Sequence, residues 1–173
     1  MKIYHTPKDL LDSAQSEETP SEELDYILSK EYSFLKVAVA KNRNTSPITL
    51  KGLIPSIMES YRDQEIALAM AENPNVTNDI LELLLHKIIP VLDNGRGHQI
   101  GFEAGIKVCN NSKLSIEPVM RAMQNSLVSM QFRKVLARET SRLDILNLLC
   151  CDKSEKVRKR AVENLSRFEN NSK

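Results

Sequence analysis

The sequence is short of the residues that many fold and function classes need. Its 173 residues include no tryptophan, four phenylalanines, four tyrosines and five glycines. Few glycines, together with frequent Leu, Ala, Glu and Lys, favour helices. So few aromatic rings argue against an enzyme that stacks flipped DNA bases on its side chains. There is no run of 18 apolar residues, which predicts that the chain has no membrane span.

Cysteines are also few, and their number is odd. With only Cys109, Cys150 and Cys151, a disulfide framework is not expected, and a reducing cytoplasm fits better. Residues 1–9 lack the apolar core and the cleavage site of an export signal, so we expect a cytoplasmic protein. Adjacent cysteines lack the two-residue gap of a zinc knuckle, and we predict no metal or other cofactor. Either Cys150 or Cys151 packs inward, and the other is a candidate reactive thiol.

What the sequence does contain is one segment that returns five times. Each copy ends at a polar residue that we call the anchor: Asn42, Asn73, Asn111, Glu139 and Asn164. Seven positions before the anchors stand Leu35, Ile66, Ala104, Phe132 and Val157, and three positions before them stand Val39, Met70, Val108, Leu136 and Ala161. Two positions before them is a small-residue column: Ala40, Ala71, Cys109, Ala137 and Val162. Such periodic self-similarity predicts a helical-repeat stack.

Each copy is predicted to be a short amphipathic helix that ends at its anchor. The three apolar positions lie on one stripe of a helix, which must face neighbouring helices. Asn tolerates left-handed backbone, so it is a sensible place for a helix to stop. Helix-start signals include Asp63, Ser129 and Ser154 before these helices and Ser46 before a second helix. The second helices carry apolar pairs: Leu24 and Ile27, Leu50 and Leu53, Leu81 and Leu84, Val119 and Ala122, and Leu146 and Leu149.

The repeat spacing is longest in the middle of the chain, where an insertion covers residues 86–101. Pro90 is expected to end a helix there, and residues 93–97 (Asp-Asn-Gly-Arg-Gly) are expected to form a turn. Because insertions in helical repeats map to loops, we predict a hinge or contact loop here, with His98 as a candidate binding residue.

Several segments resemble the leucine-rich repeat variant, a bacterial relative of the HEAT and armadillo repeats. The resemblance covers nearly the whole chain and rests on the following runs: Thr19-Pro20-Ser21-Glu22-Glu23-Leu24 with Ile27-Leu28, Leu35-Lys36 with Val39-Ala40-Lys41-Asn42, Ala71-Glu72-Asn73-Pro74, and Asp152 with Val157-Arg158 and Ala161-Val162-Glu163-Asn164. It implies a right-handed α-solenoid and a binding role. The repeat and the chain length predict an all-α fold of about five helical pairs in one domain over residues 1–173. One member of that family carries an iron–sulfur cluster on N-terminal cysteines, but no cysteine precedes Cys109 here, so that cofactor does not carry over.

Basic residues near the C-terminus are the main candidates for binding. Residues 1–120 have a net charge of −5 and residues 121–173 one of +6, and such a polarised surface can steer a charged partner. The candidates are Arg133, Lys156, Arg158, Lys159 and Arg160. If the column shared by Arg133 and Arg158 faces outward, it forms a basic row for an acidic peptide or a phosphate backbone. The competing structural interpretation is a solvated end helix.

No constellation in the sequence pairs a nucleophile with a base, so we expect no catalytic activity. The leading hypothesis is a scaffold that binds a partner protein or an acidic peptide. The alternative is a HEAT-like protein that binds nucleic acid through its basic C-terminal half, although the anionic first half disfavours a continuous track. Both hypotheses leave the oligomeric state open.

Overall fold

The computed structural model describes residues 4–93 and 99–171. Within these residues the protein is built from α-helices and one short 3₁₀ helix, without a β-strand. The helices are α1 (Pro7–Gln15), α2 (Ser21–Leu28), α3 (Ser33–Lys41), α4 (Pro47–Leu53), α5 (Tyr61–Glu72), α6 (Asn78–Ile88), the 3₁₀ helix η1 (Ile89–Val91), α7 (Gln99–Asn110), α8 (Ile116–Gln124), α9 (Met130–Glu139), α10 (Leu143–Cys150) and α11 (Glu155–Asn171). The all-helical class predicted from the sequence is confirmed for the described residues.

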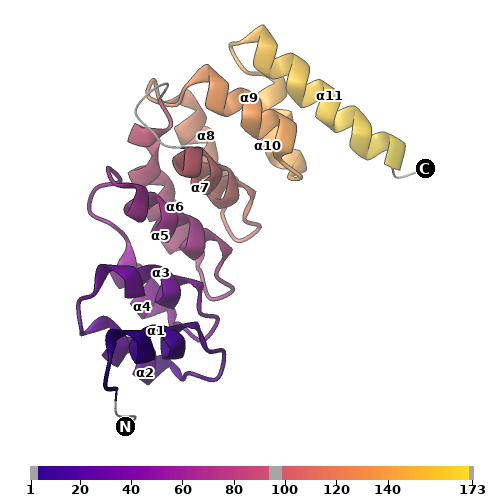
Figure 1. Ribbon diagram of the computed structural model, residues 1–173. Coiled ribbons are helices and arrows are strands. Elements are labelled where there is room, and N and C mark those ends of the chain that lie inside the picture. The colour runs from indigo at the N-terminus through magenta and orange to yellow at the C-terminus, as the bar shows by residue number, and fades with distance from the viewer. Residues whose placement is uncertain (1–3, 94–98, 172–173) are drawn as a thin grey trace.

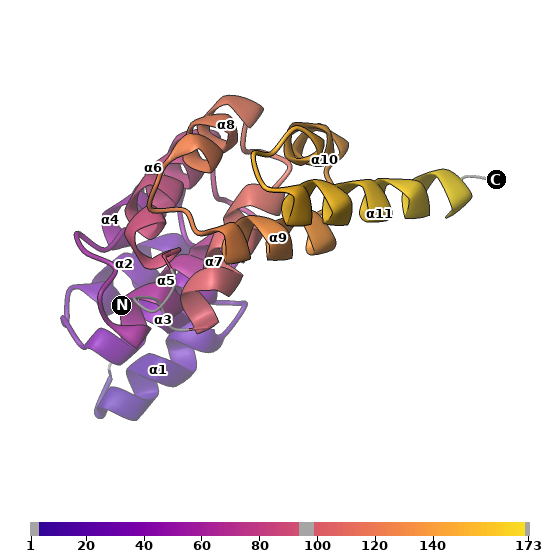
Figure 2. The same ribbon diagram turned by 90° about the horizontal axis from the view of Figure 1, so that it is seen from above.

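The helices lie in two layers along an elongated, curved stack (Figures 1 and 2). Each odd-numbered helix from α3 onward packs against the odd-numbered helix before it, which forms one layer. In the other layer α6 packs against α8, and α8 against α10. The N-terminal helices α1 and α2 and the C-terminal helix α11 lie at opposite ends of the molecule (Figure 1).

The recurrent apolar columns form the core between the layers. Val39, Met70, Val108 and Leu136 are fully buried in one continuous hydrophobic cluster, as predicted from the repeat. All five apolar pairs of the second helices are buried in the same cluster. Val162 differs, because its side chain is 55% exposed whereas the rest of the small-residue column is buried. No helix among the described residues covers Val162, so the prediction that Val162 faces a neighbouring helix is wrong.

Helix starts follow the predicted signals in part. Ser46 and Ser129 cap α4 and α9 by accepting a backbone N–H three residues later, as expected. The cap of α5 is Ser60 and not Asp63. Asp63 instead lies at the third helical position and accepts from the Ser60 backbone, which completes a capping box.

The Asn anchors join neighbouring units through their side chains. Asn42 and Asn73 end α3 and α5 with extended backbone, so the left-handed conformation expected for them is wrong. Asn73 is buried, and its Nδ2 donates to the carbonyl oxygens of Ala40 and Asn42, both at 2.8 Å. The carbonyls at a helix end have no partner within the helix, and here the next unit supplies one. We call this set of bonds, made by Asn42, Asn73, Asn111 and Asn164, the amide ladder.

One step of the amide ladder is made by arginine. Glu139, the fourth anchor in the sequence, is exposed at the end of α9, and Thr140 caps that helix. Arg142 takes over the donor role, because its Nη1 lies 3.1 Å from the carbonyl oxygen of Cys109 and 3.0 Å from that of Asn111. The prediction that Glu139 is equivalent to the anchor asparagines is therefore wrong, because Glu139 does not donate to these carbonyls. At the last step, Asn164 does not end its helix, and α11 runs on to Asn171.

In the middle of the stack, α7 packs closely on α9 through a glycine and two aromatic rings. Pro90 lies in η1, directly after the end of α6, so the predicted helix end is confirmed. A Cβ on Gly105 of α7 would lie 2.9 Å from the Phe132 ring of α9, so glycine permits this close approach. Phe132 also meets Phe102 edge to face, with 5.5 Å between ring centroids. The predicted turn over residues 93–97 and the candidate His98 lie outside the described residues, apart from Asp93.

Candidate interaction surfaces

Arg133 is buried and cannot contact a partner. Its side chain is 4% exposed, and its Nε lies 2.8 Å from Oδ2 of Asp152, whose side chain is 6% exposed. Its Nη1 donates to the carbonyl oxygen of Val128 at 2.6 Å. The column that contains Arg133 therefore points into the protein at α9, where the guanidinium ties α9 to the loop after α10. The predicted basic row along the stack does not form.

Two further predicted binding residues have local partners. Arg158 Nη1 donates to the carbonyl oxygens of Asp152 and Lys153, at 2.8 and 3.2 Å, so this side chain folds over the loop before α11. Arg160 pairs with Glu163 one turn later, with 2.7 Å between Nη1 and Oε2. That pair is exposed and contributes little to stability, so Arg160 can exchange it for a partner's carboxylate.

Lys156 and Lys159 remain as predicted basic residues that are exposed and, within the described residues, without an ion pair. Lys153 and Arg167 share this property. The structure thus reduces the predicted basic cluster to exposed cations around α11. The sequence placed Arg133 and Arg158 in a different column from Lys156 and Lys159, but it could not show that this column is engaged within the protein.

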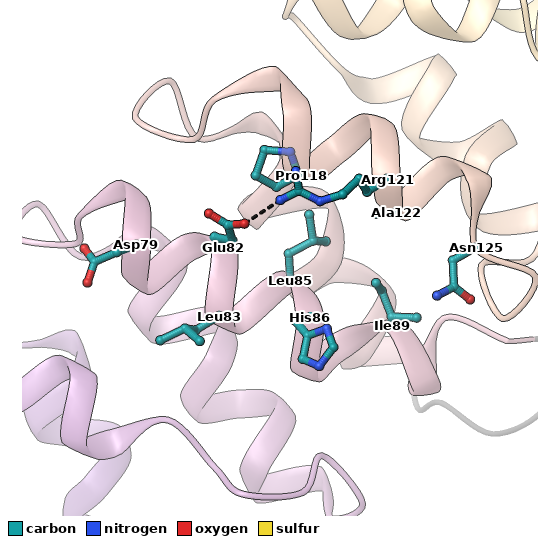
Figure 3. A pocket seen from close by; sticks show the side chains of 10 residues that line it. All are labelled: Asp79, Glu82, Leu83, Leu85, His86, Ile89, Pro118, Arg121, Ala122 and Asn125. Atoms are coloured by element: carbon teal, nitrogen blue, oxygen red, sulfur yellow. Dashed lines mark hydrogen bonds and ion pairs between the residues drawn. The ribbon is translucent and has the colours of Figure 1, made fainter.

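A groove lies between α6 and α8, on the layer of even-numbered helices (Figure 3). Its volume is about 540 Å³, within the range of ligand pockets. Leu83, Leu85, Ile89, Pro118 and Ala122 give it an apolar wall, and Asp79, Glu82, His86, Arg121 and Asn125 surround that wall with polar groups.

Some of the polar groups around this groove are already paired and others are not. Arg121 forms an ion pair with Glu82 across the groove, which joins α8 to α6 (Figure 3). The pKa of Asp79 is lowered, first by a hydrogen bond from the Thr77 hydroxyl and then by Lys51. The His86 ring and the Asn125 amide N–H groups make no hydrogen bond within the described residues. They are therefore available to a bound chain.

Sequence reasoning missed this groove because its two sides are far apart in the chain. Leu81 and Leu84 were recognised as the buried pair of α6, and both are buried. Leu83, between them, is 39% exposed, and an apolar residue on the polar side of a helix was the one available signal. Nothing in the sequence placed it in one groove with Pro118 and Ala122.

The three cysteines differ in environment. Cys109 is fully buried in the small-residue column, and burial raises the pKa of its thiol to about 12. Burial also raises the pKa of Cys150, which is partly buried. Cys151 is exposed, beside a pocket between α8 and α10 that Met120 and Met123 also line. Cys151 is thus the more accessible of the adjacent pair.

Comparisons with protein-family models, with curated proteins and with solved structures found no match to this chain. None of the helices in residues 4–93 and 99–171 is long and apolar enough to cross a bilayer. Across the same residues, no three His, Cys, Asp or Glu side chains gather as a metal site would require. The function has to be argued from the surfaces described above.

Proposed function

We propose that this protein is a non-catalytic scaffold that binds a segment of a partner protein in the groove between α6 and α8. In this proposal the two helix layers form a right-handed α-solenoid of about five helical pairs, related to the leucine-rich repeat variant and to HEAT and armadillo repeats. The observation that carries it is an open apolar groove with unpaired hydrogen-bonding groups, His86 and Asn125, beside it.

The chemistry of the groove suits a peptide with one apolar side chain. Such a side chain would cover Leu83 and Ile89, while the Asn125 amide donates to a backbone carbonyl of the peptide. The His86 ring offers one donor and one acceptor when it is neutral. Peptide recognition of this kind combines a buried apolar contact with a few placed polar groups.

The amide ladder supports binding by holding the groove in shape. Asn111 at the end of α7 donates to the carbonyl oxygen of Ala71 at the end of α5, and these helices precede α8 and α6. Arg121 and Glu82 join α8 to α6 directly. A groove whose sides are fixed in advance loses little conformational entropy when a partner binds, which favours affinity.

The test starts with affinity capture from native lysate, followed by titration of the captured protein against variants. Leu83→Arg puts a charge on the wall of the groove and should weaken binding by about 10-fold to 100-fold, as expected for a central interface residue. Ile48→Arg is the matched control, because Ile48 is 86% exposed on α4 of the same layer and outside the groove. Equal affinity for both variants, or recovery of nucleic acid alone, would overturn the proposal.

A second candidate function is nucleic-acid binding, which the exposed cations Lys153, Lys156 and Lys159 favour. It is weakened by the burial of Arg133, which removes one of the proposed phosphate contacts. Titration with duplex and single-stranded DNA at two salt concentrations tests it, since phosphate contacts must weaken steeply as salt rises. Binding that is absent, or that does not change with salt or after charge reversal at Lys156, Lys159 and Arg160, eliminates this function.

A further inference from the structure

The N-terminal end of the stack presents unpaired carboxylates. Asp12, Glu18, Glu22 and Glu31 lie on or beside α1 and α2, they are exposed, and their side chains have no partner within the described residues. Lys8 on α1 and Lys30 after α2 are exposed cations at this end, and Lys30 lies over the Tyr26 ring. Other carboxylates of this end are already engaged, such as Glu17, which pairs with Arg43 of the next unit. The unpaired charge at this end is therefore mainly negative.

The C-terminal end presents the opposite charge. Lys153, Lys156, Lys159 and Arg167 are exposed on or beside α11 and make no ion pair with any described residue. Glu155 is the exposed carboxylate in the first turn of α11. Unpaired charge of opposite sign thus lies at the two ends of an elongated molecule (Figure 1).

The C-terminal end also leaves a packing surface uncovered. In α3, α5, α7 and α9 the small-residue column is buried between odd-numbered helices that pack one on the next. In α11 the same column holds Val162, which is more than half exposed. Lys159, three residues earlier, lies on the same side of α11. An apolar side chain beside cations is a surface that a chain with carboxylates can cover.

We propose that the α11 end of one copy of this chain docks on the α1–α2 end of a second copy. Lys156 and Lys159 would face Asp12, Glu18 and Glu22, and the contact would cover Val162. A second copy is the partner because the chain itself carries the complementary charge, at an end that the same copy cannot reach. This goes beyond the proposed function, since neither end contributes to the groove between α6 and α8.

A contact between unlike ends is heterologous, so it leaves a free end on each copy and can propagate. Because it depends on exposed charges, it should weaken strongly with salt. The Debye length falls from about 30 Å at 10 mM salt to about 3 Å at 1 M salt. Sedimentation velocity of the whole chain over a range of concentrations should show reversible association at the lower salt and a monomer at the higher.

Two double variants test the contact from both sides. Lys156→Glu with Lys159→Glu makes the C-terminal end acidic, and Asp12→Lys with Glu22→Lys makes the N-terminal end basic. Each variant alone has ends of like charge and should associate about 10-fold to 100-fold more weakly than the original chain. An equimolar mixture of the two variants again offers opposite charges and should recover association, which shows that both are folded.

Three results would overturn the proposal: a chain that stays monomeric at low salt and high concentration, variants that associate as strongly as the original, and a mixture that does not associate although each variant keeps its helical circular dichroism. Failure here leaves binding in the groove unaffected, because Leu83→Arg changes neither end. Loss of groove binding in Leu83→Arg, in turn, should leave sedimentation unchanged.

Discussion

Two steps of the stack join their units with different chemistry. Between α3 and α5 the connection is neutral, since the amide of Asn73 donates to two carbonyl oxygens. At the step after α7 it is charged, because Arg142 donates to the carbonyls at the end of that helix, and Arg133 pairs with Asp152 nearby. The last step is again neutral, since the Asn164 amide donates to the carbonyls of Ala137 and Thr140. Carbonyls at equivalent helix ends thus accept hydrogen bonds from either an amide or a guanidinium. The bonds from the charged guanidinium are the stronger of the two. What recurs in the repeat is a side-chain donor to these carbonyls, and its residue type can differ.

The largest effect is expected from breaking the buried charged pair. Asp152→Ala leaves the Arg133 guanidinium buried without a counter-charge and should reduce the free energy of unfolding by about 3–5 kcal/mol. Glu82→Ala is the matched control, since it removes an exposed carboxylate from Arg121 and should cost less than about 1 kcal/mol. Urea denaturation measures both. Similar small losses would mean that the charged connection is no stronger than a surface pair.

The neutral connection is tested by Asn73→Ala. The carbonyl oxygen of Ala40 then loses the Asn73 amide, and that of Asn42 keeps only the bond from the Thr45 backbone N–H. We expect a loss of about 2–3 kcal/mol in the free energy of unfolding. Asn147→Ala, at an exposed position of α10, should change it by less than about 0.5 kcal/mol. If Asn73→Ala is as harmless as its control, the amide ladder does not hold the units together.

The small-residue column compares the inside of the stack with its end. Ala137→Val adds two methyl groups at a fully buried position and should cost about 1–3 kcal/mol through overpacking. Val162→Ala removes the same groups at the exposed end and should change the free energy of unfolding by less than about 0.5 kcal/mol. Urea denaturation of dilute protein at high salt, where the end-to-end contact is dissociated, measures both costs. Equal costs under these conditions would contradict the exposure of Val162 within a single copy.

The smallest expected effect is the pH dependence of the pair formed by Arg142 and Asp144. A hydrogen bond from Arg142 lowers the pKa of Asp144, whose side chain is 45% exposed, so solvent screens the interaction. Because the folded pKa lies below the unfolded value of about 3.9, the stabilisation is present above about pH 4 and is lost as the pH falls through the folded pKa. Denaturation of the original chain and of Asp144→Asn should therefore differ slightly at neutral pH and converge in acid. A difference that persists below the folded pKa would exclude this origin.

The sequence predicted the core well because burial leaves a periodic signal. Val39, Met70, Val108 and Leu136 recur at one place in each copy, and a stripe of apolar residues has to face a neighbouring helix. It also located the ends of α3 and α5 at Asn42 and Asn73. What it could not show was the use of their side chains, because the acceptor carbonyls belong to the preceding unit.

The candidate site was predicted less well, because a charged residue in the sequence does not show whether its side chain points to solvent or into the protein. Arg133 shares its position in the repeat with Arg158, yet the carboxylate of Asp152, nineteen positions later, draws Arg133 into the core. The groove is lined by residues of α6 and α8, such as Leu85 and Pro118, that are too far apart in the sequence for a local pattern to relate them. The exposed Leu83 on α6 indicated an apolar surface there, but it did not show that α8 forms the other wall of the groove.

The length of α11 decides whether a further unit could extend the amide ladder. Because the helix continues past Asn164, the carbonyls of Val162 and Asn164 are taken by the N–H groups of its own next turn. No later unit could reach them with an asparagine. Tandem duplication could therefore lengthen the protein by copying a pair such as α5 and α6 within the chain. A unit fused after residue 171 would find no free carbonyl acceptors. It would find them only if α11 were shortened to end at Asn164.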